Sequence, residues 1–184
     1  KFSLKKGVLK AKEVQLKSMS GNITGELALS QTKEGNIRLI TTSKLDQINV
    51  RQLFYEFENF GQNSMRHKHL RGKTTADIYL HTEWDPYLNH LPENLYAFLD
   101  MKINNGELID FEPMLLMSNY ISIDELKRIR FSTLENQIEV KNRCVKIPFM
   151  EIHSSAMDIA GSGTHFFDNT LDYEIEFSLN EVMS

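Results

Sequence analysis

Residues 171–179 read LDYEIEFSL, and this alternation decides the fold class. Successive side chains of an extended strand point to opposite faces, so the apolar residues share one face and the acidic residues share the other. The apolar set is Leu171, Tyr173, Ile175, Phe177 and Leu179. The opposite set is Asp172, Glu174, Glu176 and Ser178. The stretch therefore predicts a half-buried strand whose acidic face is solvated.

Similar alternation recurs along the chain. Strands are expected at residues 8–16, 23–29, 37–41, 74–82 and 95–103, and only strands and turns after residue 131. Short glycine-containing links between the early segments favour antiparallel hairpins. Asn104-Asn105-Gly106 is expected to close a hairpin, because Asn-Gly favours tight turns. Together these patterns predict a mainly β fold, a curved antiparallel meander of about ten strands.

Two or three short helices are expected in the middle of the chain. After Asn49, the expected N-cap by residue type, the apolar spacing becomes helical at Leu53, Phe54, Phe57 and Phe60. Gly61 is expected just past the end of this helix. Residues 111–117 predict another short helix. Residues 122–125 form a capping box, from which Leu126 and Ile129 are expected to continue a helical turn.

The two ends of the chain resemble each other when the sequence is shifted by 136 positions. Val8 then meets Cys144, Ile23 meets Ile159, and the apolar parity persists through three strands. Ile37, Leu39 and Thr41 meet Tyr173, Ile175 and Phe177 without a gap. This predicts two similar sheet units, at about residues 3–43 and 139–179, with a helix-bearing insertion at about 49–130. Chance agreement between two meanders is the alternative, since alternation is a two-state pattern.

Length and composition bound the class of protein. The 184 residues fit a single domain, taken here as residues 1–184, with 41% hydrophobic residues and a net charge of −4. That charge gives no general electrostatic reason to bind nucleic acid. Cys144 is the only cysteine, so no internal disulfide can form. No apolar run reaches the roughly 20 residues of a membrane-spanning helix. The chain is expected to be a segment of a longer protein whose targeting elements lie elsewhere.

The residues capable of metal binding or catalysis do not form a known motif. His67 and His69 would share one face of a strand, but Arg66, Lys68 and Arg71 oppose a dication there. His81 and His90 are the other histidines considered for such a site. Asp158 lies between His153 and His165, with Ser154, Ser155 and Ser162 nearby. A serine hydrolase needs a sharp elbow, whereas Gly161-Ser162-Gly163 is expected to be a hairpin turn.

Four carboxylates are also candidates for catalytic groups. Asp77, Glu83, Asp85 and Glu93 lie around an irregular, proline-containing segment, so solvated surface positions are expected. The glycine pairs lack the spacing and the following helix of a phosphate-binding loop. The sequence therefore predicts no catalytic residue, no cofactor, no metal site and no enzymatic activity.

The apolar inventory leaves two alternatives open. The chain has 11 phenylalanines and 8 methionines, among them Met114, Met117, Met150 and Met157. These residues suit a packed core, and they also suit an adaptable lipid groove. Phe54, Phe57, Phe111, Met114 and Leu115 on the intervening helices would fill such a groove in the first case. A closed core is favoured, because soluble proteins rarely expose apolar patches beyond a few hundred Å².

The second half of the chain contains a Gly-x-Gly-Thr-His-x-Phe run at residues 161–167 before the last strand, with upstream segments at residues 103–108 and 111–113. In these features it resembles the C-terminal region of AsmA-like proteins of the Bacteroidetes type. The other matching residues are Phe131-Ser132-Thr133-Leu134, Ile138, Val140, Ile147-Pro148, Met150, Ile152, Ser154-Ser155, Ile159 and Leu171-Asp172-Tyr173. The first half resembles the family only loosely, and none of these motifs contains an active residue.

This resemblance implies a periplasmic segment, tethered to the inner membrane by an anchor outside the chain. It further implies a role in outer-membrane assembly or in lipid transfer between membranes, with phospholipid or another envelope lipid as partner. The alternative is an envelope scaffold with a closed core that binds other envelope proteins and no lipid. The candidate site, as apolar groove or core face, consists of Leu171, Tyr173, Ile175, Phe177, Met150 and Ile152.

Overall fold

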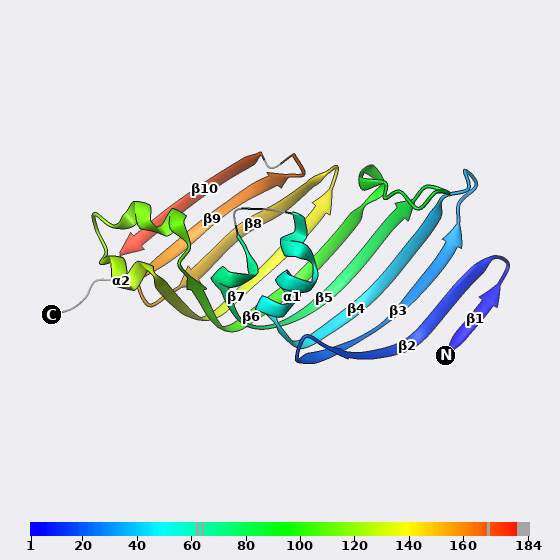
Figure 1. Cartoon of the computed structure of the whole chain (residues 1–184), viewed down its shortest axis with the longest axis horizontal. Helices are drawn as coiled ribbons and strands as arrows, with labels where there is room; N and C mark the ends of the chain where they lie inside the picture. Colours follow the sequence, from blue (N-terminus) through cyan, green and yellow to red (C-terminus); the bar gives the residue numbers. More distant parts are fainter. Residues whose placement is uncertain (62, 64, 169, 180–184) are drawn as a thin grey trace.

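One open antiparallel sheet of ten strands, ordered as in the sequence, forms the framework of the protein (Figure 1). The computed structural model describes residues 1–61, 63, 65–168 and 170–179. The strands are β1 (Phe2–Lys5), β2 (Val8–Ser18), β3 (Gly21–Gln31), β4 (Ile37–Asn49), β5 (Leu70–Trp84), β6 (Tyr96–Ile109), β7 (Arg128–Lys141), β8 (Cys144–His153), β9 (Met157–Phe166) and β10 (Leu171–Leu179). The predicted mainly β antiparallel meander is confirmed.

The short helices lie in the connections between strands. They are α1 (Val50–Glu56), η1 (Glu58–Gly61), η2 (His67–His69), η3 (Pro92–Asn94), η4 (Glu112–Met117) and α2 (Ile123–Leu126). Asn49 caps α1 as expected, since its side-chain oxygen accepts a hydrogen bond from the Gln52 N–H at 3.0 Å. The helix ends at Glu56, earlier than its apolar spacing suggested, because Glu58, Asn59 and Phe60 adopt positive φ.

The second helical segment is also shorter than expected. Ser122 caps α2, since its hydroxyl accepts from the Glu125 N–H and donates to the Glu125 carboxylate at 2.7 Å, so the predicted N-cap is confirmed. The reciprocal bond of a capping box, from the Ser122 N–H to the Glu125 side chain, is not formed among the described residues. The expected continuation to Ile129 is wrong, because β7 already begins at Arg128. Ile129 instead pairs with Leu108 of β6. The amphipathic spacing at Leu126 and Ile129 thus serves a helix and a strand that meet in one core.

The hydrophobic core lies between one face of the sheet and the helical connections, which lie on the same side of it (Figure 1). Near α1 the buried residues are Leu45, Ile48, Ala76, Val50, Leu70 and Ile103. Near η4 and α2 they are Met114, Ile121, Leu126, Ile129 and Met157. Each cluster lies where a helical connection covers the sheet. The rest of that face is not covered by a helix within the described chain.

Asn104-Asn105-Gly106 does not form the expected hairpin turn, because β6 passes straight through it. Asn105 has φ 50°, and the pairing of β5 with β6 shifts register beside it, between Arg71 and Lys73. The tolerance of Asn for left-handed φ is used here for an irregularity within a long strand. Gly106 is required because the ring of Phe131 occupies the position where a Cβ would lie.

Gly106→Ala is expected to lower the free energy of unfolding by about 2 kcal/mol, as overpacking of a buried site does. Urea unfolding followed by circular dichroism measures the change. The double variant Gly106→Ala/Phe131→Leu should recover part of the loss, since the shorter side chain leaves space for the methyl group. A Gly106→Ala protein as stable as the wild type would show that Phe131 does not hold this position.

The strand pairing at the two ends of the sheet agrees with the 136-residue shift for three strands. Val8 pairs with Ser30 as Cys144 pairs with Phe166, and both hairpins shift register at equivalent points, Ala11/Val14 and Ile147/Met150. The β1–β2 pair Leu4↔Leu9 likewise corresponds to Val140↔Val145. The gap-free alignment of the next strand is wrong. Leu27 pairs with Thr41, and Gly163, which lies 136 positions after Leu27, pairs with Tyr173. Tyr173 lies only 132 positions after Thr41, so the last strand is offset by four residues. The two-unit repeat is therefore not confirmed.

Candidate functional site

A single row of paired residues crosses all ten strands on the face that carries the helices. Directly paired residues of antiparallel strands point to the same face. The row is Phe2, Ala11, Leu27, Thr41, Leu80, Ala97, Val140, Val145, His165 and Leu171. Most of its members are apolar, so the apolar face continues from β1 to β10. We call the part of this face outside the helix-covered clusters the open apolar face.

The neighbouring row belongs to the opposite face and is mainly polar. It consists of Glu26, Thr42, Tyr79, Phe98, Glu139, Lys146, Thr164 and Asp172. Two ion pairs lie on the same polar face, Lys44–Asp77 at 3.4 Å and Lys102–Glu135 at 2.6 Å. The sheet therefore separates an apolar side from a charged side.

The open apolar face is not sealed. Leu27, Leu80, Val140 and Val145 are only half-buried, although each belongs to the middle of the sheet. At β10, Tyr173 is 40% exposed and Ile175 is 48% exposed. The expected closed core is therefore wrong for these residues. The physical reason is that the helical connections are too short to cover a sheet of ten strands, and they cover only the strands next to α1 and next to η4 and α2.

The six candidate residues share this face at the β8–β10 end, and the structure gives them different environments. Met150 and Ile175 lie in one row through Gly161, and Ile152 and Phe177 lie in the next through Ile159. Ile152 is buried, and Phe177 packs against the core near α2. Leu171, Tyr173 and Ile175 are exposed. The predicted solvation of Asp172, Glu174 and Glu176 is confirmed, and the side chain of Leu179 lies outside the described residues.

Gly161-Ser162-Gly163 is not the expected hairpin turn but the middle of β9. Tyr173 pairs with Gly163, and a Cβ on this glycine would overlap the tyrosine ring. Glycine here lets the Tyr173 ring lie flat on the backbone of the neighbouring strand. Partial burial raises the pKa of the Tyr173 hydroxyl above its ordinary value.

The central part of the open apolar face was missed in the sequence. Its residues include Leu27, Leu80, Leu99, Ile138 and Val145. Each alternates with polar neighbours in its own strand, and this signal was present. It could not show which strands are adjacent. Asn136 lies on the same side of the sheet but pairs with Met101 beside the clusters under α1, and its buried Oδ1 has no hydrogen-bond partner among the described residues.

The histidines considered as metal ligands have separate local partners. His67 lies beside the side chain of Asn59, and buried His69 accepts a hydrogen bond from the Arg66 N–H at 3.1 Å. His90 contacts the Thr82 hydroxyl at 2.8 Å, and His81 lies 3.5 Å from Glu83. Burial and the charges of Lys68 and Arg66 lower the pKa of His69. Among the described residues, no group of three or more His, Cys, Asp or Glu side chains is arranged to hold a metal ion.

The four candidate carboxylates are also dispersed. Asp77 pairs with Lys44, and Asp85 accepts hydrogen bonds from the backbone N–H groups of Tyr87 and Asn89. Glu93 lies in η3. Glu83, by contrast, is buried, which the sequence did not predict. It accepts hydrogen bonds from Arg38 Nε at 2.7 Å and from the Asn36 and Asn94 side chains at 3.4 and 3.0 Å.

The Ser, His and Asp residues near the start of β9 form only part of a catalytic arrangement. His153 Nδ1 lies 3.1 Å from Asp158 Oδ1 on an exposed surface. The Ser154 hydroxyl donates to the Met157 carbonyl, and the Ser155 hydroxyl accepts from the Arg130 N–H at 3.1 Å. The known partners of both serines are thus backbone groups that shape the β8–β9 turn. His165 lies on the apolar face, opposite Leu171.

No protein-family model, curated protein or solved structure matches the chain. None of the helices in the described part of the chain is long and apolar enough to cross a membrane.

Proposed function

We propose that this protein is a non-enzymatic lipid-binding segment whose open apolar face covers acyl chains. The observation that carries the proposal is the apolar row through all ten strands, which is half-buried in its middle and exposed at its ends. A broad, shallow apolar surface suits flexible hydrocarbon chains better than a small rigid ligand. The charged opposite face would meanwhile remain in water.

The resemblance to AsmA-like proteins supports a place for this activity in the bacterial envelope. Such a segment would guide phospholipid or another envelope lipid between membranes, as part of outer-membrane assembly. The anchor in the inner membrane would lie outside this segment. The envelope scaffold without lipid is the alternative outcome of the test below. Such a scaffold was expected to have a closed core, and the residues of the open apolar face do not form one.

We also propose that the sheet arose from two copies of a three-strand unit, residues 2–31 and 138–166. Support comes from the equal register of β1–β2–β3 and β7–β8–β9 and from their equivalent register shifts. Repetition of such a unit lengthens an apolar face strand by strand without changing its character.

Leu80→Asp and Tyr79→Asp test the lipid-binding proposal as a matched pair. Both residues belong to β5, but Leu80 lies on the open apolar face and Tyr79 on the opposite face. The protein is incubated with vesicles of phosphatidylethanolamine and phosphatidylglycerol, re-isolated, and examined by native mass spectrometry for bound phospholipid. Leu80→Asp is expected to lose most of the bound lipid, roughly tenfold or more, because a carboxylate is expensive to bury against acyl chains.

Tyr79→Asp should retain the lipid, since it introduces the same charge on the face that meets water. A wild-type protein that never carries phospholipid would contradict the proposal and favour the scaffold. Equal loss in both variants would show that binding does not depend on the open apolar face. Circular dichroism of each variant confirms that the sheet is intact.

A further inference from the structure

The two outer edges of the sheet carry opposite charges. Residues 1–18, which form β1 and β2, contain six lysines and one glutamate. Residues 147–179, which form most of β8 and all of β9 and β10, contain six acidic residues and no Lys or Arg. The strands between them separate these two ends of the sheet (Figure 1). Such an asymmetry points to an electrostatic partner for each edge.

Each edge also shows the two-faced alternation of the sheet. On β1, Phe2 and Leu4 are 80% and 72% exposed on the apolar face, while Lys1 and Lys5 are exposed on either side of them. On β10, Tyr173 and Ile175 are exposed on the apolar face, and the acidic residues alternate with them. Within the described chain, Lys1, Lys5, Asp172, Glu174 and Glu176 form no ion pair.

Both edges have counterparts inside the sheet that accept an antiparallel strand. The pairing of β1 with β2 has the register of β7 with β8, and the other edge of β7 pairs with β6. β10 pairs with β9 as β4 pairs with β3, apart from a four-residue shift, and the other edge of β4 pairs with β5. The outer edge of β1 therefore corresponds to the edge of β7 that pairs with β6, and the outer edge of β10 corresponds to the edge of β4 that pairs with β5.

We propose that a second copy of this chain adds its β10 to the outer edge of β1, so that the sheets join head to tail. Because the sheet has ten antiparallel strands, β10 runs opposite to β1 (Figure 1). A copy placed in the same orientation therefore meets β1 in antiparallel fashion, with its apolar face on the same side. An even number of strands is what makes this continuation possible.

One register satisfies both faces of the joint. When Phe2 faces Ile175, Leu4 faces Tyr173, and an exposed apolar pair forms at each position. The same register places Lys1 opposite Glu176 and Lys5 opposite Asp172. Opposite charges in directly paired positions stabilise a sheet, and like charges destabilise it. Pairing of β1 with β1 or of β10 with β10 is therefore disfavoured, which directs association to the unlike edges.

Such a contact is heterologous, because β1 and β10 are different surfaces. It leaves one free edge of each kind after every addition, so the assembly is open-ended. The open apolar faces of successive copies would form one longer surface. This inference goes beyond the proposed lipid binding and holds whether or not lipid is carried.

Sedimentation velocity and equilibrium of the whole chain over a range of concentrations test the joint. The expected result is a weight-average mass that rises steadily above 21.4 kDa without a plateau. Lys1→Glu/Lys5→Glu should reduce the association constant by roughly tenfold or more, and Asp172→Lys/Glu176→Lys should do the same. A mixture of the two variants should associate again, because the acidic β10 of the first then meets the basic β1 of the second.

The matched control is Lys33→Glu/Lys141→Glu, which changes the net charge equally at two exposed positions away from both edges, one in the β3–β4 turn and one at the end of β7. It should associate like the wild type. A monomeric wild type at every concentration would overturn the proposal, as would a mixture of the charge variants that stays monomeric. Equal weakening by the control would show a general charge effect instead of an edge contact.

The failure of this joint is distinguishable from the failure of lipid binding. Leu80→Asp should lose bound phospholipid and still associate, since Leu80 lies in the middle of the sheet. Lys1→Glu/Lys5→Glu should become monomeric and still bind phospholipid, since its substitutions leave the open apolar face unchanged. Loss of both properties in either variant would contradict their independence.

Discussion

Ile129→Asp is expected to lower the free energy of unfolding by about 4 kcal/mol or more, enough to unfold a marginally stable domain. Ile129 is 1% exposed and belongs to the core cluster that contains Met114, Leu126 and Met157. An aspartate there buries an unpaired carboxylate and removes apolar contacts. Thermal and urea unfolding at neutral pH measure the loss.

Ile175→Asp is the matched control, because it makes the same chemical change on the exposed apolar face of β10. It should cost less than about 1 kcal/mol, since water already reaches the site. Bound phospholipid should fall in this variant if the open face carries lipid as far as β10. A loss of stability comparable to that of Ile129→Asp would show that β10 is covered in solution, and the open face would then end before it.

Arg38→Met is expected to destabilise the fold by about 3 kcal/mol at neutral pH, because it leaves the buried Glu83 carboxylate without its cation. Burial by itself raises the pKa of Glu83. The hydrogen bond and the charge of Arg38, together with the hydrogen bonds of Asn36 and Asn94, nevertheless hold that pKa below its ordinary value. Glu83 is 5% exposed, whereas the Arg38 side chain is 40% exposed, so the cost arises mainly at the carboxylate.

The pH dependence of this loss has a defined sign. In the wild type the folded-state pKa of Glu83 is depressed, so its stabilising contribution is present above the ordinary glutamate pKa, about 4.3, and is lost as the pH falls through the lower folded value. Without Arg38, its hydrogen bond and charge no longer lower this pKa, so the variant protonates the carboxylate at higher pH. The difference in stability between wild type and Arg38→Met should therefore shrink as the pH is lowered below about 5.

Urea unfolding of both proteins between neutral and acidic pH measures this trend. The double variant Arg38→Met/Glu83→Gln removes the buried charge and should show a smaller, nearly pH-independent loss. A constant difference between wild type and Arg38→Met across the pH range would mean that Glu83 does not carry the interaction.

Glu83 shows why the buried polar sites were out of reach of the sequence. Its carboxylate is enclosed by Arg38 and Asn36, far away in the chain, and by Asn94 from the loop after β5. Nothing in the alternation of β5 distinguishes Glu83 from the exposed Asp77 on the same strand. The α1 cap at Asn49 and the α2 cap at Ser122 are the contrasting case, because each depends on residues at most three positions away.

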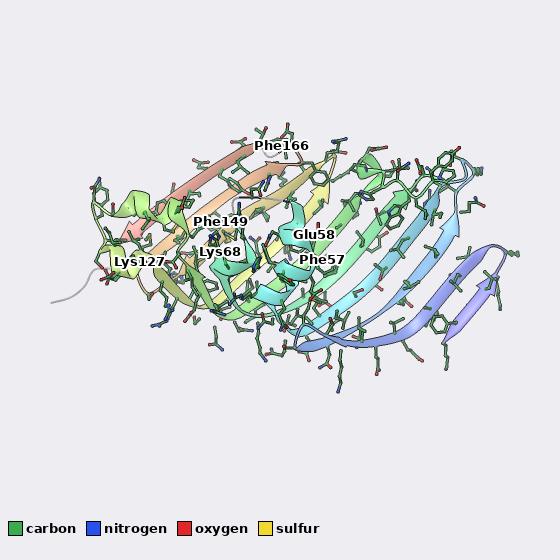
Figure 2. All side chains as sticks on the ribbon, in the orientation of Figure 1. Phe57, Glu58, Lys68, Lys127, Phe149 and Phe166 are labelled. Carbon is green, nitrogen blue, oxygen red and sulfur yellow. The ribbon has the colours of Figure 1, made fainter. Side chains whose placement is uncertain are left out.

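Phe57 and Phe60 show the same limit for apolar residues. Their spacing with Phe54 indicated one helical face, yet α1 ends at Glu56 and both rings are more than half exposed (Figure 2, in which Phe57 is labelled). The two rings stack on each other with centroids 5.5 Å apart. The expectation that Phe57 would help to fill the groove is therefore not met, while Phe54, Phe111 and Met114 do pack against the core.

By itself, the sequence determined the strands and which of their side chains share a face, as in LDYEIEFSL, because alternation is a property of each strand alone. It also determined where α1 and α2 begin, through the caps at Asn49 and Ser122. Only the tertiary structure decided that Asn105 lies within a strand, that Tyr173 rests on Gly163, and that the apolar face stays open. Those outcomes depend on which strands are neighbours and on how far the connections reach across them. Packing between residues distant in the chain sets both, so local pattern leaves a closed core and an open face indistinguishable.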